Sequence, residues 1–216
     1  MQAALFDAYG TLLDVASAVT PHAHRLGGQA EAFSLLWRTK QLEYAWVRTL
    51  AGQHLDFARI TDDALAFAAT THGIEDVALL SELRDGYEQL AAFPDAAPAL
   101  RAVGVTRMVL SNGPPPMLGR QLRHAGLAEL FDDVLSAEAA GAFKPHADVY
   151  RLAIARLGLP AAEIAFMSSN PWDVFGAHGF GFRAIWVNRK GQPDEYGLRG
   201  TVPEIADLSA LPALLG

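Results

Sequence analysis

Short apolar runs alternate with helical segments along much of the chain, and this alternation limits the fold more than any other feature. Strand-like runs are expected at 3–6, 107–110, 131–136, 164–167 and 184–187. Helical spacing of apolar residues is expected at 117–125, 147–157 and 173–178. Strands that alternate with helices predict an α/β fold built on a doubly wound parallel sheet.

Residues 15–93 have a different character, because apolar residues such as Leu42 and Trp46 recur there with helical spacing. No strand-like run is convincing in this stretch, and Thr61 is a candidate cap for a helix that starts beside it. Pro94 disfavours a continued helix and marks the return of the alternating pattern. We therefore predict a helical domain at 15–93, inserted into a core made of 1–14 and 94–216.

Polar residues stand at or just past the predicted ends of three of the apolar runs. They are Asp7, Ser111, Asn112, Ser168, Asn170 and Asp173. Open α/β sheets bind their ligands at the carboxyl ends of the strands. The sequence therefore predicts a site at this edge of the sheet.

Composition excludes several classes of protein. The 216 residues include no cysteine, so disulfides, cysteine-ligated zinc and thiol catalysis are excluded. The formal net charge of −7 argues against a nucleic-acid partner, which favours a basic surface. The first residues lack the basic and apolar regions of a signal peptide, and no apolar run approaches a membrane span. We expect a cytoplasmic protein without a membrane partner.

The charged candidates each have a plainer alternative. Asp7 precedes a Gly-Thr turn, where a carboxylate can act as a nucleophile that forms an ester, but capping a turn is the commoner role. Lys144 could hold such a carboxylate ionised and attract an anionic substrate, although a lone lysine is usually solvated. Pro145 restricts the backbone of Lys144 and favours a fixed position. Arg38, taken alone, has the character of a solvated helix charge.

The polar segments are also open to two interpretations. Ser111, Asn112 and Gly113 could present donors to an anion, but Asn-Gly is equally a common turn pair. The segment 168–173 is crowded with small polar residues, whereas capping a helix needs only one of them.

Taken in order along the chain, these segments resemble the motifs of the haloacid dehalogenase (HAD) superfamily, and within it the type II L-2-haloacid dehalogenase family. The resemblance covers nearly the whole chain and is carried by 6–14, 37–44, 110–113, Lys144-Pro145 with Tyr150, 168–173 and 186–189. It implies a Rossmann-like core with a helical cap inserted after the first motif.

The resemblance also implies roles for single residues. Asp7 would be the nucleophile, and the residues that hold it or help to position and activate water would be Thr11, Lys144, Ser168, Asn170 and Asp173. Ser111 with nearby backbone N–H groups would bind the substrate carboxylate, and Arg38 and Asn112 would cradle the halide. Tyr9 and Tyr150 would shape and hydrogen-bond the site, and the apolar wall would consist of Leu42, Phe57 and Trp172.

These roles describe hydrolytic dehalogenation of short L-2-haloacids, with haloacetates and fluoroacetate as further candidates. An SN2 attack by Asp7 would release halide, and water would then hydrolyse the ester to a 2-hydroxy acid with inversion at carbon 2. Asp173 and Lys144 are both candidates for the base of the second step. The reaction as written needs no metal and no cofactor.

A phosphatase is the main alternative, because most superfamily members resemble phosphatases. Those members carry a second aspartate two residues after the nucleophile, where this chain has Tyr9. They also carry an acidic pair for Mg²⁺ in the last motif, where 168–173 has only Asp173. A catalytically silent binding protein is a third hypothesis, which the reactive residue types at the matched positions disfavour.

Some properties depend on details outside these motifs. Pro114 follows Gly113 where the family more often has a hydroxyl residue, and Pro171 replaces a small residue, so the preferred substrate size could differ. A homodimer is expected only because related dehalogenases are often dimeric.

Overall fold

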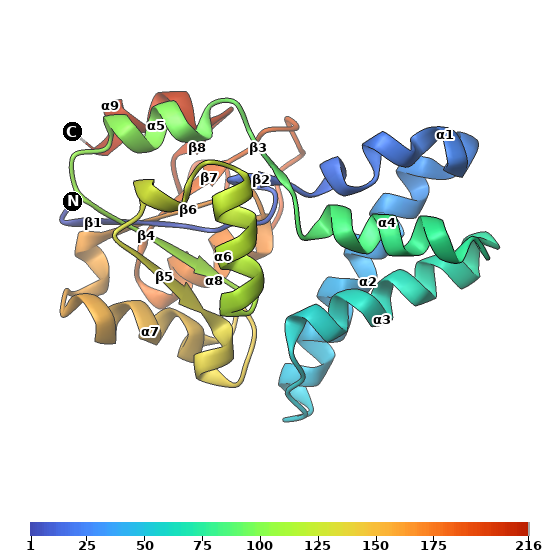
Figure 1. Cartoon of the computed structure of the whole chain (residues 1–216). Helices are drawn as coiled ribbons and strands as arrows, with labels where there is room; N and C mark the ends of the chain where they lie inside the picture. The colour runs from blue at the N-terminus through green and yellow to red at the C-terminus, as the bar shows by residue number, and fades with distance from the viewer. Residues whose placement is uncertain (216) are drawn as a thin grey trace.

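The computed structural model describes residues 1–215, which form two parts lying side by side (Figure 1). One part holds the main sheet together with the N-terminus and the last helix. The other part consists of α1 (Ala23–Leu26), α2 (Ala30–Leu50), α3 (Phe57–His72) and α4 (Val77–Tyr87). Along residues 1–215, no helix combines the length and apolarity that crossing a bilayer requires.

Every neighbouring pair of strands in the main sheet is parallel, in the order β5–β4–β1–β6–β7–β8. The strands are β1 (Ala3–Phe6), β4 (Thr106–Ser111), β5 (Asp133–Ser136), β6 (Ile164–Ser168), β7 (Arg183–Val187) and β8 (Glu204–Ile205). All residues of the central strand β1 are buried, as expected for a parallel sheet covered on both faces. The predicted α/β fold with a parallel sheet is confirmed.

Helices cover the sheet from both sides, with α5 and α9 on one side and α7 on the other in Figure 1. The helices of this part are α5 (Ala96–Ala102), α6 (Pro115–His124), α7 (Ala147–Leu157), α8 (Pro171–Phe180) and α9 (Leu211–Leu215). The helix predicted at 147–157 has the bounds of α7. The short elements β8 and α9 were not predicted, because so few residues carry no periodic signal.

A small antiparallel ribbon marks the place where the chain passes between the two parts. β2 (Leu13–Asp14) pairs with β3 (Ala91–Ala92), and Leu13 lies opposite Ala92. β3 falls within 15–93, where we predicted no strand, so that expectation is wrong at this end of the stretch. Two consecutive alanines give no alternation of polar and apolar residues, which is why the pattern missed them.

The start of α3 also differs from the prediction. The helix begins at Phe57, and the side chain of Asp56 caps it by accepting a hydrogen bond from the Ala58 N–H at 2.6 Å. Thr61 is therefore not the cap. It lies inside the helix, buried, and its hydroxyl donates to the Phe57 carbonyl at 2.7 Å. A threonine inside a helix commonly bonds back to the preceding turn in this way.

Candidate active site

Three parallel strand ends meet at one edge of the sheet. β1 lies between β4 and β6 and pairs with both in parallel, so their carboxyl ends reach the same edge. Asp7 directly follows β1, while Ser111 and Ser168 are the last residues of β4 and β6. The polar residues that follow the apolar runs are therefore brought together, as we predicted.

Asp7 stands at the beginning of a tight turn. The N–H groups of Thr11 and Leu12 both donate to the Ala8 carbonyl, at 3.3 and 2.9 Å. Gly10 has a φ of +83°, in the left-handed region that residues with a Cβ rarely adopt. The glycine of the first motif is thus required by the turn that positions the carboxylate.

One oxygen of the Asp7 carboxylate, Oδ2, is surrounded by donors. Thr11 Oγ1 donates to it at 2.9 Å, Asn170 Nδ2 at 2.8 Å and Ser168 Oγ at 3.3 Å. Thr11 Oγ1 also accepts from the Ser169 N–H at 2.8 Å, which turns the hydroxyl hydrogen toward Asp7. The Asp7 side chain is only 5% exposed, so these groups replace most of its water.

Lys144 lies between two buried carboxylates. Its Nζ is 2.8 Å from Asp7 Oδ1 and 2.6 Å from Asp173 Oδ2, and it also donates to the Leu110 carbonyl at 3.0 Å. Burial by itself lowers the pKa of the ammonium group, but Asp173 and then Asp7 outweigh burial, so the pKa of Lys144 lies above its usual value. Lys144 therefore stays protonated and balances carboxylate charge.

Asp173 lies in the first turn of α8, which Asn170 precedes and Pro171 begins. A proline fits the first position of a helix, because its missing N–H would be unpaired there in any case. The Tyr150 hydroxyl donates to Asp173 Oδ1 at 2.8 Å. Burial raises the pKa of Asp173 to about 6, with Lys144 opposing the shift and Asp7 adding to it. The structure thus provides a carboxylate that gains and loses its proton close to neutral pH.

Asp7 and the residues that surround it are called the Asp7 cluster below. They are Asp7, Thr11, Lys144, Ser168, Asn170 and Asp173.

Ser111 and Asn112 are buried beside the cluster. The Ser111 hydroxyl accepts a hydrogen bond from the Gly113 N–H at 3.2 Å, so its own hydrogen is left for another acceptor. Asn112 Oδ1 accepts from the backbone N–H of Lys144 at 2.9 Å. This bond joins the loop that carries Lys144, called the lysine loop below, to the end of β4. The Asn112 Nδ2 group takes no part in the bond.

Tyr9, which we expected to shape and hydrogen-bond the site, forms separate bonds through its hydroxyl and its carbonyl. The hydroxyl donates to Gln121 Oε1 at 3.0 Å, rather than to Asp7. Burial raises the pKa of Tyr9 well above its usual value, so the phenol is neutral. The part of Tyr9 that bonds to the cluster is its carbonyl, which accepts from Asn170 Nδ2 at 3.0 Å.

Arg38 reaches this region from α2. Its guanidinium carbon lies 5.7 Å from the centre of the Tyr9 ring, and Nη1 donates to Gln41 Oε1 at 2.6 Å. Within residues 1–215, no carboxylate forms an ion pair with Arg38. Its positive charge is therefore available to an anion that enters the site.

Two pairs of aromatic rings lie near these groups, where we expected an apolar wall. Tyr9 stacks on Phe57, which begins α3, with 5.8 Å between ring centres. Trp172 of α8 meets Trp46 of α2 edge to face at 5.3 Å. Leu42 is half-buried and lies one helical turn from Trp46 on α2. The expected wall thus takes residues from both parts of the chain.

Sequence reasoning missed two residues that join α2 to the lysine loop. Trp46 Nε1 donates to the Lys144 carbonyl at 3.1 Å, and Thr49 Oγ1 accepts from the Phe143 N–H at 3.0 Å. The available signal was the helical spacing that places Trp46 on the same face of α2 as Arg38.

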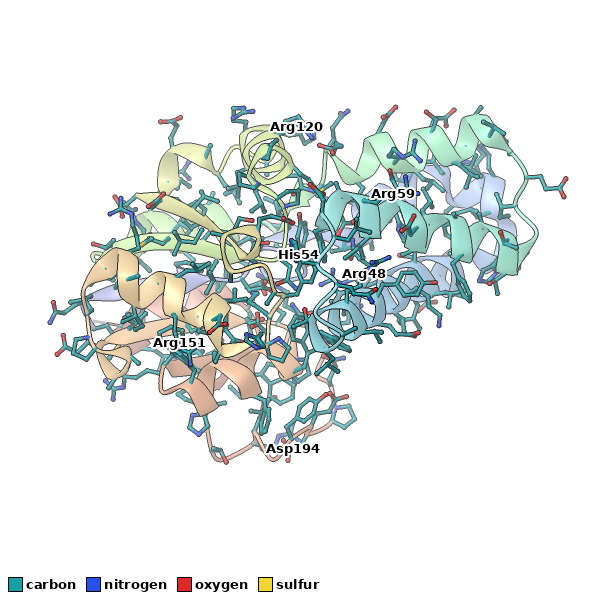
Figure 2. All side chains as sticks on the ribbon, turned by 90° about the horizontal axis from the view of Figure 1, so that it is seen from below. Arg48, His54, Arg59, Arg120, Arg151 and Asp194 are labelled. Atoms are coloured by element: carbon teal, nitrogen blue, oxygen red, sulfur yellow. The ribbon has the colours of Figure 1, made fainter. Side chains whose placement is uncertain are left out.

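A third connection between the two parts lies in the turn after α2. His54 Nε2 is 2.8 Å from Glu138 Oε2, and Figure 2 shows His54 between the helical part and the sheet part. Glu138 Oε1 also accepts from the Phe57 N–H at 3.2 Å. No pattern in the sequence pairs residues so far apart, so neither residue was predicted.

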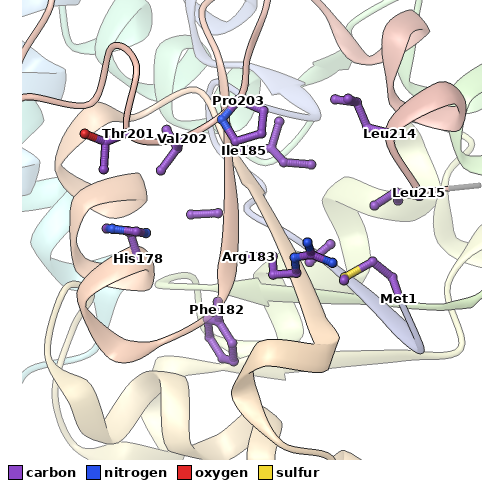
Figure 3. Close-up of a pocket in the computed structure, with 12 residues that line it drawn as sticks. Met1, His178, Phe182, Arg183, Ile185, Thr201, Val202, Pro203, Leu214 and Leu215 are labelled. Carbon is purple, nitrogen blue, oxygen red and sulfur yellow. The ribbon is translucent and has the colours of Figure 1, made fainter.

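A separate hollow of about 330 Å³ lies at the amino ends of β6 and β7 (Figure 3). Its lining includes Met1, Ala165, Arg183 and Leu215. These residues lie at the opposite ends of the strands from Asp7, so the hollow is not part of the Asp7 cluster.

Comparison with known proteins places this architecture in one family. The family model described as haloacid dehalogenase-like hydrolase matches residues 1–181. "(S)-2-haloacid dehalogenase 1" of Pseudomonas sp. (strain CBS-3) is 45% identical over 219 residues, which span 100% of this chain and 96% of that protein.

Solved structures agree in fold over the full length. A crystal structure of a dehalogenase superposes with a TM-score of 0.96 at 44% identity, covering 100% of this chain and 97% of that one. The L-2-haloacid dehalogenase from Xanthobacter autotrophicus with chloropropionic acid covalently bound has a TM-score of 0.87 at 36% identity, covering 100% and 98%.

The parallel sheet, the buried Asp7 cluster and these matches define the class: the chain belongs to the haloacid dehalogenase-like hydrolases. Curated relatives with 43% to 45% identity are named (S)-2-haloacid dehalogenases. The resemblance predicted from the motifs is confirmed.

Proposed function

We propose that this protein is an (S)-2-haloacid dehalogenase, which hydrolyses short L-2-haloacids and haloacetates to 2-hydroxy acids. The observation that carries the proposal is the state of Asp7, a buried carboxylate paired with a protonated lysine and held by three further donors. The names of the relatives support the same activity, and a covalently bound chloropropionic acid in one of them is what an ester route requires.

The first step is displacement of halide by Asp7. Oδ2 is held by three donors, whereas Oδ1 is held by Lys144 alone, so Oδ1 keeps more of its lone-pair density for attack. Oδ1 bonds to carbon 2 as the carbon–halogen bond breaks with its electron pair, and the configuration inverts. The unpaired charge of Arg38 and the Nδ2 group of Asn112 stabilise the departing halide.

The second step is hydrolysis of the ester. Once Oδ1 carries the substrate, Oδ2 is the carbonyl oxygen, and the same donors form an oxyanion hole for it: Thr11, Ser168 and Asn170. Water attacks the carbonyl carbon of Asp7, and the 2-hydroxy acid leaves with the former Oδ1.

The proton of the attacking water goes to Asp173, which then passes it to the leaving oxygen, so that the product departs with a hydroxyl group and Asp7 is restored to a carboxylate once its own remaining proton is lost to solvent. Of the two candidates for the base, Lys144 has a raised pKa and stays protonated, so it cannot accept a proton at neutral pH. Asp173 has a pKa of about 6 and is mostly ionised at pH 7. Tyr150 and Lys144 hold the two oxygens of Asp173 in place for this role.

The remaining groups bind the acid. The free hydrogen of the Ser111 hydroxyl and nearby N–H groups receive the substrate carboxylate. The alkyl part lies against the wall of Leu42, Phe57 and Trp172, with the Tyr9 ring beside it.

The proposal also covers the organisation of the protein. Its core would be 1–14 and 94–216 and its cap 15–93, as the sequence predicted. The separate position of α1–α4 and the β2–β3 ribbon at the passage between the parts support this division. A cytoplasmic location and a homodimer belong to the same proposal, and cell fractionation and light scattering test them.

The decisive assay follows halide release from chloroacetate, fluoroacetate and L-2-chloropropionate in chelator, beside p-nitrophenyl phosphate with Mg²⁺. Halide release without phosphate release supports the proposal and begins to rank the halogens. Phosphate release without halide release would refute it, and would mean that Tyr9 does not exclude phosphatase chemistry.

A further inference from the structure

Gln41 of α2 is a buried polar side chain that the reaction itself does not use. It is 1% exposed, and its carboxamide forms hydrogen bonds with Arg38, Thr61 and Tyr87. A glutamine in such a place needs every one of these partners, because an unpaired amide costs stability inside a protein.

The neighbours fix which end of the carboxamide faces Arg38. The Thr61 hydroxyl gives its hydrogen to the Phe57 carbonyl at 2.7 Å, so toward Gln41 it can only accept. Gln41 Nε2 therefore donates to Thr61 Oγ1, at 2.6 Å, and also reaches the Tyr87 hydroxyl at 3.0 Å. The oxygen Oε1 is left to accept, and it receives Arg38 Nη1 at 2.6 Å and, more distantly, the Tyr87 hydroxyl at 3.2 Å.

This arrangement positions Arg38 without neutralising it. A carboxylate is the usual partner of a partly buried arginine, and it would cancel the charge. Here the acceptor is neutral, and within residues 1–215 no acid pairs with the guanidinium. Arg38 is therefore held at hydrogen-bond distance, as in an ion pair, but its positive charge is not neutralised.

We propose that Gln41 is a positioning residue that holds Arg38 by a neutral acceptor, so that the arginine keeps its full charge for the leaving halide. The inference rests on the proposed function, since the anion is the halide that Asp7 displaces. It predicts that the neutrality of this side chain matters more than its shape.

The test replaces Gln41 with an isosteric acid and with an apolar residue of similar length. In Gln41→Glu, the introduced carboxyl pairs with Arg38. The bromide inhibition constant should therefore be at least roughly tenfold higher than in the wild type, which corresponds to a loss of about 1.4 kcal/mol in the free energy of halide binding. In Gln41→Leu the arginine is less well placed but still charged, so the inhibition constant should rise by only about threefold. The readout is the bromide inhibition constant from initial rates, with kcat and KM measured alongside.

Gln121→Glu is the control for the cost of burying a carboxyl. Gln121 is also fully buried and bonds to tyrosine groups at Tyr9 and Tyr87, but not to Arg38. It should lower the melting temperature in a similar way and change the bromide constant less than Gln41→Glu does. An unchanged bromide constant in Gln41→Glu, or an equal rise in Gln41→Leu, would overturn the proposal.

A second pair of variants carries the test if Gln41→Glu does not fold. Ser34 lies one helical turn before Arg38 and is half-buried, so Ser34→Glu brings an acid within reach at little burial cost. The bromide constant should rise in Ser34→Glu and not in Ser34→Gln; equal constants would overturn the proposal. If the wild type releases no halide, the proposed function is refuted. If the wild type is active but the bromide constants of the acidic variants equal that of the wild type, only the inference about Gln41 is refuted.

Discussion

At the scale of single residues, the site is a balance of buried charges. Lys144 lies within hydrogen-bond distance of both Asp7 and Asp173, so one ammonium group compensates two carboxylates that water hardly reaches. Burial and Asp7 leave Asp173 with a pKa of about 6, while Lys144 remains charged. In the proposed mechanism, the same three residues supply a nucleophile, a fixed cation and a base.

Replacing Asp7 with asparagine should abolish turnover, because a carboxamide oxygen is too weak a nucleophile to displace halide. We expect a loss of roughly 10⁴-fold or more in kcat, measured as halide release. The circular dichroism spectrum should stay that of the wild type. Asp148→Asn, at an exposed position of α7, is the control and should keep its rate; appreciable turnover by Asp7→Asn would refute the nucleophile assignment.

The pH dependence of kcat should report Asp173. The base must be ionised to accept a proton, and its pKa of about 6 lies above the usual pKa of an aspartate, so activity is present above pH 6 and is lost as the pH falls through 6. Below that point kcat should fall by about tenfold per pH unit where hydrolysis limits the rate. Mass spectrometry of acid-quenched enzyme should then show ester accumulating on Asp7. A kcat that stays constant between pH 5 and 7, about one unit either side of the pKa, would contradict the assignment of Asp173 as the base.

At the scale of elements, the strand ends were predictable and their neighbours were not. An apolar run followed by a polar residue placed Asp7, Ser111 and Ser168 at one edge, because parallel strands share an edge. The bonds of Gln41 to Thr61 and Tyr87, and of Trp46 to Lys144, join distant parts of the chain, and no local pattern encodes them. The bond from the Tyr9 hydroxyl to Gln121 also joins distant segments, and the sequence made no prediction about it.

Helix α8 allows a matched test of how closely the elements around Asp173 pack. A Cβ at Gly176 would come within 2.5 Å of Pro145 Cβ and 2.7 Å of the Tyr150 hydroxyl, whereas one at Gly179 meets nothing within 4 Å. Gly176→Ala should therefore destabilise the protein by about 1–3 kcal/mol and lower kcat by displacing Tyr150 from Asp173.

Gly179→Ala should have the opposite effect on stability, a gain of about 0.5–1 kcal/mol, because alanine restricts the unfolded chain more than glycine does. Urea unfolding measures both variants. Equal effects on stability would contradict the packing argument.

At the scale of the whole molecule, the proposed site takes residues from both parts of the chain. Arg38, Leu42 and Phe57 come from the helical part, while the Asp7 cluster comes from the sheet edge. The alternating pattern predicted the sheet and the helical insert, but it could not show how the two lie together. The contacts that join them, such as His54 with Glu138, appear only in three dimensions.

The reaction as a whole should not depend on a metal ion, because a lysine supplies the charge that lies between the two carboxylates. Prolonged dialysis against chelator should leave the rate of halide release unchanged within error. Wild type dialysed without chelator is the control. A loss of activity that Mg²⁺ restores would point back to phosphatase-like chemistry.

The most direct test of the central claim is a single turnover in ¹⁸O-water with enzyme in excess over L-2-chloropropionate. If Asp7 attacks carbon 2 and water then attacks the ester carbonyl, the lactate formed is the D enantiomer without ¹⁸O at its hydroxyl, and the label appears in the Asp7 carboxylate. If lactate instead carries ¹⁸O at its hydroxyl and Asp7 is unlabelled, water displaces the halide directly and the account given for Asp7 is wrong.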